Sequence, residues 1–564
     1  MMYLFYRTGR NTLLRNGILI YICIVGSFLF EKDKNDTVAV LLPSHKDSSI
    51  NNTTQYFNQF FSPTHDIAIS LNKNRPVLPE SLISSNNHFV VHFTREGKDA
   101  VTPLDTNTNR IPDWIEIIAD AFEKSYEVEI NQLGYRLPPS FKNGTKFYDV
   151  YVLDLTNNYA ITMSEDVDST ALEQKKVSSY ILFDNDFVGP GYHSYGDSAI
   201  KVTAAHEFFH AIQLGYIFRK SDGFFFELTA VWMEDQVFDE IDNYLYYFDY
   251  FFSAPAIPLN GVSYTIRNIF NHMYGSAIFA FFLSENFGVD IIRQIWELMP
   301  DKNALEAVDY VLRRYGSNFE SQFLQFSLWN FFTGDRAKPD YFYKNGEIYP
   351  EIQIEKDMLI DYYADQNGKG YFLTASYYIF HPVENGEYKA TLSTDQTDHW
   401  RLAVAVFDEN AVSSYFSKSD KSIELGDMTK DQTIVVIPCN VDRITNPSHV
   451  YFKDEPESYS FYIYKERKAA PTVVKSFQIQ NAYPNPFSRQ VTFVVKKISD
   501  SPLSIRVFNI RGQQVNQFEV NELSQELNHI NWQISPNKNL PPGIYFFKFA
   551  AGDFFETTKV ILCR

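Results

Sequence analysis

The chain has 564 residues, of which 45% are hydrophobic and 21% are charged, so it is long enough for three or four globular domains. Aromatic residues are abundant, with 37 Tyr and 50 Phe, and this composition favours β-rich packing. The formal net charge of -19 argues against nucleic acid or an anionic membrane surface as the partner.

The N-terminus has the pattern of an export signal. Three arginines precede the largely apolar stretch 17–30, which has the length of a signal hydrophobic region and is short for a membrane span. We therefore expect residues 1–30 to be a signal peptide, with an uncleaved anchor as the alternative, and no stable membrane span in the mature chain. Residues 31–85 are polar and rich in Asn and Ser, which predicts a pro-segment or linker.

Alternating and β-branched residues predict the first strand at 88–94, and further core strands at 148–155 and 178–187. Helical patterns dominate from the glycine-rich stretch before residue 200 onwards. Together these elements predict an α+β domain over 86–342. An extended peptide would bind along the edge of its sheet.

Residues 105–116 follow the spacing of a calcium-binding loop. Oxygen ligands fall at loop positions 1, 3, 5, 7, 9 and 12, where position 7 offers its backbone carbonyl: Asp105, Asn107, Asn109, Ile111, Asp113 and Glu116. Arg110 replaces the glycine that is usual at position 6, so a turn that caps the following helix is the alternative. We predict a structural calcium ion here, and a helix that begins at Asp113.

The stretch Thr203–Gly215 contains the pattern His-Glu-x-x-His, formed by His206, Glu207 and His210. Positions i and i+4 share one face of a helix, so two imidazoles at this spacing suit one zinc ion. Glu207 then becomes the candidate general base for a water molecule. The alternative is a buried helix with two hydrogen-bonded histidines. Gly215 predicts the end of the helix.

A zinc ion that performs chemistry needs a third protein ligand and one open position. Sixteen residues separate His210 from Glu227, where a second predicted helix begins. Glu234 lies two helical turns further along the same face. It is the alternative third ligand, or a carboxylate that orients a histidine. For either glutamate, a solvated helix face is the alternative.

This region resembles the gluzincin metallopeptidases, in which a Glu on the following helix is the third zinc ligand. The sequence Glu-Leu-Thr-Ala at 227–230 is similar to the corresponding turn of that clan. The resemblance also implies a Tyr or His aimed at the substrate oxyanion. Tyr274 heads an apolar helix predicted over 273–288, and His272 lies just before it, so both are candidates. Ordinary packing at a helix end is the alternative for both residues.

The resemblance to a family of secreted bacterial zinc metallopeptidases covers residues 85–340. The shared landmarks are a DxNxN-x-x-PD loop, two strands of the types VYVLDL and SYIxxDNDF, the helix HEFFHAIQ, the helix ExTAxWxE and a YGxxxF helix. This resemblance implies a zincin-like catalytic domain, but it implies no particular substrate.

The pattern changes to alternating strands separated by Gly, Asn and Asp turns over 345–465, which predicts an accessory β-sandwich. A charged linker over 466–476 follows it. The remaining stretch 477–564 contains NAYPNPF, then VFNIRG and then GIYF. These landmarks closely resemble the type A sorting domain of type IX secretion substrates, a small Ig-like sandwich. The resemblance implies the type IX secretion machinery as a partner, and a secreted or outer-membrane cell-surface location.

These features predict an exported, monomeric zinc metallopeptidase, which hydrolyses peptide bonds in a protein or peptide substrate with a metal-activated water. The chain lacks the G-x-M-E-N stretch that anchors a free α-amine in gluzincin aminopeptidases, which favours an endopeptidase. The competing hypothesis is a catalytically inactive surface adhesin or binding protein with a peptidase-like fold.

Overall fold

The computed structural model describes the following residues, and every structural statement below concerns them: 67–69, 75–142, 146–165, 173–261, 267–394, 398–416, 422–443, 456–466, 476–498, 502–520, 524, 527–535, 540–552 and 554–563. The predicted signal peptide and residues 467–475 of the predicted linker lie outside this set.

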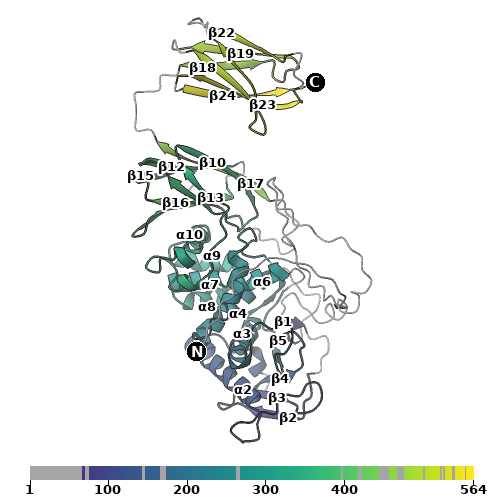
Figure 1. The fold of residues 1–564 in the computed structure, drawn as a ribbon. Coiled ribbons are helices and arrows are strands. Elements are labelled where there is room, and N and C mark those ends of the chain that lie inside the picture. The colour runs from purple at the N-terminus through teal and green to yellow at the C-terminus, as the bar shows by residue number, and fades with distance from the viewer. Residues whose placement is uncertain are drawn as a thin grey trace, which may run out of the picture. The chain divides into compact units, whose positions relative to one another are not determined.

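A six-stranded mixed sheet with the order β1-β5-β7-β4-β3-β2 forms the base of the N-terminal half (Figure 1). Its strands are β1 (Ile67–Ile69), β2 (Glu80–Ile83), β3 (Phe89–Phe93), β4 (Tyr148–Leu153), β5 (Ala160–Ser164) and β7 (Ser179–Asp184). β3, β4 and β7 run parallel to one another, whereas β5 is antiparallel to β7. A separate two-stranded sheet pairs β6 (Glu173–Gln174) with β8 (Phe218–Arg219).

The sheet begins earlier in the chain than the sequence predicts. β1 and β2 lie within 31–85, the range predicted as a pro-segment or linker, and they form the two edges of the sheet. The sheet therefore extends before the predicted domain start at residue 86, and these two strands are not part of a loose segment. The strands have only 3 and 4 residues, too few for a periodic hydrophobic pattern to be recognised.

Two helices pack on the sheet. α2 (Asp113–Tyr126) contacts β3, and α3 (Gly196–Tyr216) contacts β5 and β7. α2 begins at Asp113 as predicted, because its apolar residues recur at helical spacing and bury Ile115, Ile118 and Phe122. It continues directly into a π-helix over Glu127–Gln132.

The rest of this half is helical. Its members are α4 (Gly223–Val237), α5 (Leu245–Phe252), α6 (Arg267–Gly275), α7 (Ile278–Phe287), α8 (Asp290–Leu298), α9 (Ala304–Arg314) and α10 (Phe319–Phe331). The single helix predicted over 273–288 is therefore wrong, because it divides into α6 and α7. A Cβ on Gly275 would lie 2.4 Å from the carbonyl oxygen of Tyr247, so this glycine allows α5 and α6 to approach closely. Tyr274 consequently lies in the last turn of α6 and does not head a helix.

Two sheets occupy the range predicted as an accessory sandwich, with the orders β10-β17-β12-β15 and β14-β13-β16-β11-β9. Their strands are β9 (Lys356–Ile360), β10 (Tyr363–Gly370), β11 (Tyr378–Pro382), β12 (Gly386–Ser393), β13 (Trp400–Phe407), β14 (Val412–Phe416), β15 (Ser422–Met428), β16 (Thr433–Asn440) and β17 (Glu457–Glu466). This region shares a hydrophobic core with the helices, since Phe331 and Phe332 of the α10 end contact Phe407 of β13.

The C-terminal region has sheets with the orders β18-β19-β22 and β21-β20-β23-β24. Its strands are β18 (Phe477–Tyr483), β19 (Gln490–Lys497), β20 (Leu503–Asn509), β21 (Gln514–Val520), β22 (Leu527–Gln533), β23 (Gly543–Ala551) and β24 (Phe554–Leu562). The predicted turn after β20 is present, because Asn509 Oδ1 accepts hydrogen bonds from the backbone N–H groups of Arg511 and Gln513. In the NPF landmark, Asn485 Oδ1 accepts from the N–H of Ile561 at 2.8 Å, which ties the first loop to the last strand.

The mixed α/β composition, the several domains and the β-rich C-terminal half agree with the predicted fold class. Within the described residues, no single helix is long and apolar enough to cross a membrane. One pair of helices, Phe270–Phe287 and Asp290–Leu298, passes the length and composition test together, with a bend of 114° between them.

Candidate metal centre

Helix α3 presents both histidines of the His-Glu-x-x-His pattern. It runs from Gly196 to Tyr216, so it starts earlier than the predicted stretch and continues past Gly215. A Cβ on Gly215 would lie 3.1 Å from the Pro139 ring, so this glycine serves close packing and does not end the helix. His206 and His210 are one helical turn apart and both buried. Their ring centroids lie 4.6 Å apart.

Glu227 of α4 lies between the two imidazoles. Its Oε2 is 3.4 Å from Nε2 of His206 and 3.4 Å from Nε2 of His210. These three side chains form the one group of His, Cys, Asp and Glu residues, within the described parts of the chain, whose ligand atoms converge closely enough to hold a metal ion. Glu227, the residue predicted as the third ligand, is therefore the carboxylate that the fold brings to the histidines.

The separations fit a zinc ion. Two ligand atoms at about 2.1 Å from a tetrahedral zinc ion lie about 3.4 Å apart, which is the spacing of both Nε2 atoms from Glu227 Oε2. The Nε2 of His210 and both Glu227 oxygens are buried and have no hydrogen-bond partner among the described residues. Such orphaned donor atoms are costly in a folded protein unless something binds them. Two imidazoles and a carboxylate are a ligand set that zinc commonly uses.

Electrostatics keep the Glu227 carboxylate charged despite its burial. Burial raises its pKa, but the neighbouring His210 and His206 outweigh burial and lower the pKa to about 2. In the metal-free protein the Glu227 carboxylate is therefore an anion beside protonated imidazoles, and each ring must release its Nε2 proton before it can bind a metal.

A second layer of side chains fixes the two rings. His206 Nδ1–H donates to Glu234 Oε1 at 2.8 Å, and Asn243 Nδ2 donates to the other oxygen of Glu234 at 3.1 Å. His210 Nδ1–H donates to Gln213 Oε1 at 2.6 Å. With Nδ1 as the donor in each ring, the lone pair of Nε2 is directed to the metal group. Glu234 thus orients a histidine and is not among the converging ligands.

The Gln213 side chain is fixed in turn, because its Nε2 donates to the Phe226 carbonyl and to Thr229 Oγ1 of α4. Neither Gln213 nor Asn243 was predicted as part of the site. Gln213 lies three residues after His210, on the same helical face, so the spacing was a usable signal. Asn243 lies between α4 and α5, and its role depends on a tertiary contact.

Glu207 faces the sheet beside the metal group. The Thr162 hydroxyl of β5 lies 2.6 Å from Glu207 Oε2 and also 2.9 Å from the Glu207 carbonyl oxygen. Glu207 is only 2% exposed. The predicted general base is therefore anchored to β5, one residue along the helix from a ligand histidine.

Aromatic residues, among them Tyr274, lie beside the metal group. Its ring lies 5.9 Å from the His206 ring, nearly parallel to it, and 4.9 Å from Tyr247. Tyr247 in turn contacts His193, whose pKa burial lowers to about 4. His272, the other oxyanion candidate, stacks on Phe251 with 5.0 Å between ring centroids, and burial lowers its pKa to about 3. The structure thus brings Tyr274 to the metal group and shows no contact between that group and His272.

One further buried acid was not predicted. Glu129, in the π-helix after α2, is fully buried, and neither of its carboxylate oxygens has a hydrogen-bond partner among the described residues. Burial raises its pKa well above the usual range, while the field of His206 acts in the opposite direction. No motif in the sequence pointed to Glu129.

The loop over 105–116 is curled by its own side chains. Asp105 accepts hydrogen bonds from the backbone N–H groups of Asn109 and Arg110, and Glu116 accepts from the amide groups of Asn107 and Asn109. Arg110, at the position where glycine is usual, has a φ of 74°. Asp113 accepts from the N–H of Thr106 and donates its own N–H to the Leu104 carbonyl at 2.8 Å, so the loop is tied to the start of α2 without a side-chain cap. The calcium ion stays a prediction.

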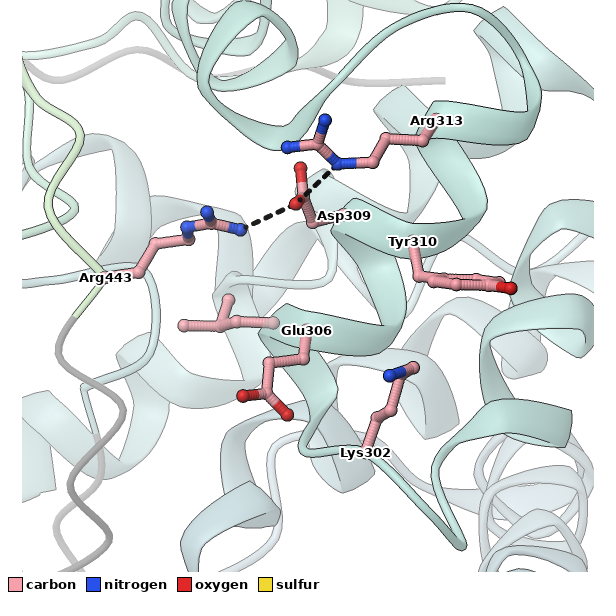
Figure 2. Close-up of a pocket in the computed structure, with 7 residues that line it drawn as sticks. Lys302, Glu306, Asp309, Tyr310, Arg313 and Arg443 are labelled. Atoms are coloured by element: carbon pink, nitrogen blue, oxygen red, sulfur yellow. Dashed lines mark hydrogen bonds and ion pairs between the residues drawn. The ribbon is translucent and has the colours of Figure 1, made fainter.

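An open cavity is lined by a different set of residues, which Figure 2 shows. It has a volume of about 400 Å³ and is lined by Lys302, Leu305, Glu306, Asp309, Tyr310, Arg313 and Arg443. None of these residues belongs to the metal group, so this cavity does not mark the site.

The comparisons with known proteins bear on the two ends of the chain differently. Residues 481–563 match the family described as a secretion system C-terminal sorting domain. The chain carries a type IX sorting domain. The protein is therefore secreted or displayed at the cell surface through type IX secretion. Residues 52–325 match a family of unknown function, DUF6055. That match contains the whole metal group and also β1 and β2, but it assigns no activity.

No curated protein matches the chain. Among solved structures, the Yersinia pseudotuberculosis-derived mitogen is 14% identical with a TM-score of 0.15, over 20% of this chain and 93% of that one. A mutant of PliG-Ec, a periplasmic inhibitor of g-type lysozyme from Escherichia coli, is 11% identical with a TM-score of 0.13, over 20% and 98%. β-Glucuronidase from Ruminococcus gnavus is 12% identical with a TM-score of 0.17, over 36% of each chain. Scores this low carry no argument about fold or function.

Proposed function

We propose that this protein is an exported zinc-dependent peptidase whose centre is formed by His206, His210 and Glu227. The observation that supports this most is the placement of Glu227 Oε2 at 3.4 Å from both Nε2 atoms. Glu207, which follows His206 in the chain, is not one of the converging ligands and remains available as a base. A purely structural zinc site is usually closed by four protein ligands, whereas three ligands leave one position for chemistry. A zinc ion bound there would supply Lewis acidity, which acidifies water and polarises a carbonyl group.

The protein's own groups account for the remaining steps. Glu207, anchored by the Thr162 hydroxyl, takes a proton from water and returns it to the leaving amine. Glu234 and Gln213 hold the two imidazoles in the required tautomer. Tyr274, whose ring stacks beside that of His206, is the candidate donor of a hydrogen bond to a developing oxyanion.

The test compares zinc content and peptide cleavage in the purified full chain. We expect one zinc ion per chain by elemental analysis, and much less than one in His206→Ala. Glu207→Gln should keep the zinc and cleave a casein or peptide library about 10²- to 10⁴-fold more slowly, which is the usual contribution of a general base. Glu240→Gln, on an exposed residue beyond α4, is the matched control.

Cleavage by Glu207→Gln at the wild-type rate would contradict the assigned base. A wild-type chain that purifies without zinc, and whose zinc content His206→Ala leaves unchanged, would contradict the metal centre itself.

A further inference from the structure

The strand next to the proposed centre is not the outermost strand of the sheet. β5 pairs with β7 on one side, and β1 occupies its other side in parallel orientation. The pairing is short, with Ile67 opposite Thr162, Ala68 opposite Met163 and Ile69 opposite Ser164. Without β1, β5 would present a free edge of backbone N–H and C=O groups, and such an edge readily accepts another strand.

This edge is directly connected to the proposed base. Thr162, which Ile67 faces in the register, is the residue whose hydroxyl contacts Glu207 Oε2 at 2.6 Å. The backbone of β1 therefore lies one strand spacing from the residue that anchors Glu207. A peptide added to β5 at this position would likewise lie one strand from the residue that anchors Glu207, and β1 now fills that place.

The chain after β1 is fastened to the sheet by one arginine. Arg75 Nε and Nη2 donate to the two oxygens of Glu165, at 2.8 and 2.7 Å, directly after the end of β5. Its other terminal nitrogen pairs with Asp149 of β4, and the guanidinium lies 5.3 Å from the Tyr180 ring centroid. A bidentate carboxylate pair of this kind fixes position as well as contributing energy.

Beyond Arg75 the chain continues to the opposite edge, where β2 pairs with β3 (Figure 1). Leu78 packs on the way against the cluster of Tyr151, Ile161, Met163 and Tyr180. Residues 67–69 at the edge beside the centre and residues 75–83, which end at the far edge, are together called the strap. Only the first three paired residues of this strap lie at the position of an added strand on β5.

We propose that the outer edge of β5 is the binding site for an extended peptide, and that residues 67–69 are its intramolecular occupant. Peptide substrate and β1 compete for the same backbone groups of β5, so β1 keeps the centre closed until it is displaced or removed. The Arg75 clamp sets how firmly β1 stays in place. This inference rests on the proposed function for the identity of the competing ligand, but strand exchange itself does not require zinc or cleavage.

The experiment uses the full chain carrying Glu207→Gln, so that binding is measured without turnover. The test variant adds Ala68→Pro and Ile69→Pro. Successive strand N–H groups point in opposite directions, so one of the two prolines removes the donor that faces β5. Ala68→Ser, which keeps the N–H, is the matched control. Arg75→Gln is a second variant, and it loosens the strap without altering β1.

Two readouts are expected to change together. Backbone amides of residues 160–164 should exchange with solvent at least tenfold faster in the double-proline variant than in the control. A fluorescein-labelled peptide with the sequence of residues 64–70 should bind the variant at least tenfold more tightly than the control, and binding should restore the protection of 160–164. Arg75→Gln should shift both readouts in the same direction.

Unchanged exchange of 160–164, or no peptide binding in variants that retain zinc and a cooperative melting transition, would show that β1 is a fixed strand. Unfolding of both variants would likewise show that β1 is a fixed strand. Peptide binding without any cleavage by the Glu207-containing double-proline variant would support the strand-exchange site and contradict the proposed peptidase function. The two failures are therefore distinguishable.

Discussion

The roles of the two glutamates on α4 can be separated by one substitution. Glu234→Ala removes the acceptor of His206 Nδ1–H at 2.8 Å and of Asn243 Nδ2–H at 3.1 Å, in a position where only 4% of Glu234 is exposed. All three converging ligand atoms remain, so zinc stoichiometry should stay at one per chain. Loss of a partner of this type lowers metal affinity about 10- to 100-fold, which corresponds to about 1.4–2.7 kcal/mol. The unpaired buried donor should also lower the free energy of unfolding by about 1–3 kcal/mol.

The assay is a zinc titration in competition with a chelator, combined with chemical unfolding of the metal-free chain. Glu240 is exposed, and among the described residues its carboxylate forms no closer ion pair than the 4.0 Å contact with Lys201. The control variant Glu240→Ala should therefore match the wild type in both measurements. Glu227→Gln should abolish stoichiometric binding. If Glu234→Ala abolishes stoichiometric zinc while Glu227→Gln retains it, the assignment of ligand and orienting residue is reversed and the reasoning from distances fails.

Three other outcomes follow from separate parts of the chain. Burial, followed by the nearby Asp242 and Asp239, raises the pKa of Asp235 to about 7, so the folded state binds more protons than the unfolded state between about pH 4 and 7. The free energy of unfolding should therefore fall as pH rises through this window, and Asp235→Asn should remove up to about 4 kcal/mol of that fall. Urea unfolding at pH 4.5 and 7.5 measures the difference. Equal pH dependence in the wild type and the variant would contradict this. Calcium at a hundredfold excess over Kd should raise the free energy of unfolding of the wild type by about 2.7 kcal/mol and that of Asp105→Ala not at all, as judged from melting curves. Identical melting of the wild type with and without calcium would show that the loop over 105–116 is only a turn at the start of the helix. Deletion of residues 477–564 should leave zinc content and cleavage unchanged but retain the protein in the periplasm of a type IX-competent host; normal amounts of the truncated protein outside the cell would contradict the sorting role.

Much of the candidate centre was predictable, because two of its three converging residues lie four positions apart in one helix. His206 and His210 are fixed by helical spacing alone, whereas only the resemblance of residues 227–230 to the gluzincin turn favoured Glu227 as the third ligand. Whether Glu227 or Glu234 meets the histidines was not decidable, because seven residues place both on the same face of α4. Only the crossing of α3 and α4 places one carboxylate between the Nε2 atoms and the other against Nδ1 of His206.

The errors have a common cause, which is that the deciding contact lies far away in the chain. β1 pairs with residues 162–164, nearly a hundred positions later, and three residues alone have no recognisable period. The break between α6 and α7 follows from the approach of α5 to Gly275, which no local pattern records. The orienting role of Asn243 depends in the same way on a tertiary contact with Glu234.

The two C-terminal regions differ in how they relate to the metal centre, although the sequence predicted both as sandwiches. The region over 345–465 has a core between its own two sheets and also packs one sheet face into the core of the helices, where α10 connects it through α7 to α4, which carries Glu227. Ion pairs accompany this contact, with Asp309 held by Arg313 and Arg443 as Figure 2 shows.

Ion pairs at partly exposed positions each contribute about 0–1 kcal/mol, so they cannot be the main support of this contact. The aromatic contacts are the main support of this contact, because the ring centroid of Phe407 lies 5.5 Å from that of Phe331 and 5.1 Å from that of Phe332. The C-terminal region instead has a core of its own, built from residues such as Phe493, Trp532 and Phe547. The unit that supports the centre therefore extends through β17, whereas the sorting domain folds around separate contacts. Removal of the sorting domain and removal of the preceding sheets are for that reason different perturbations: the first leaves the core around α4 intact, and the second exposes one side of it.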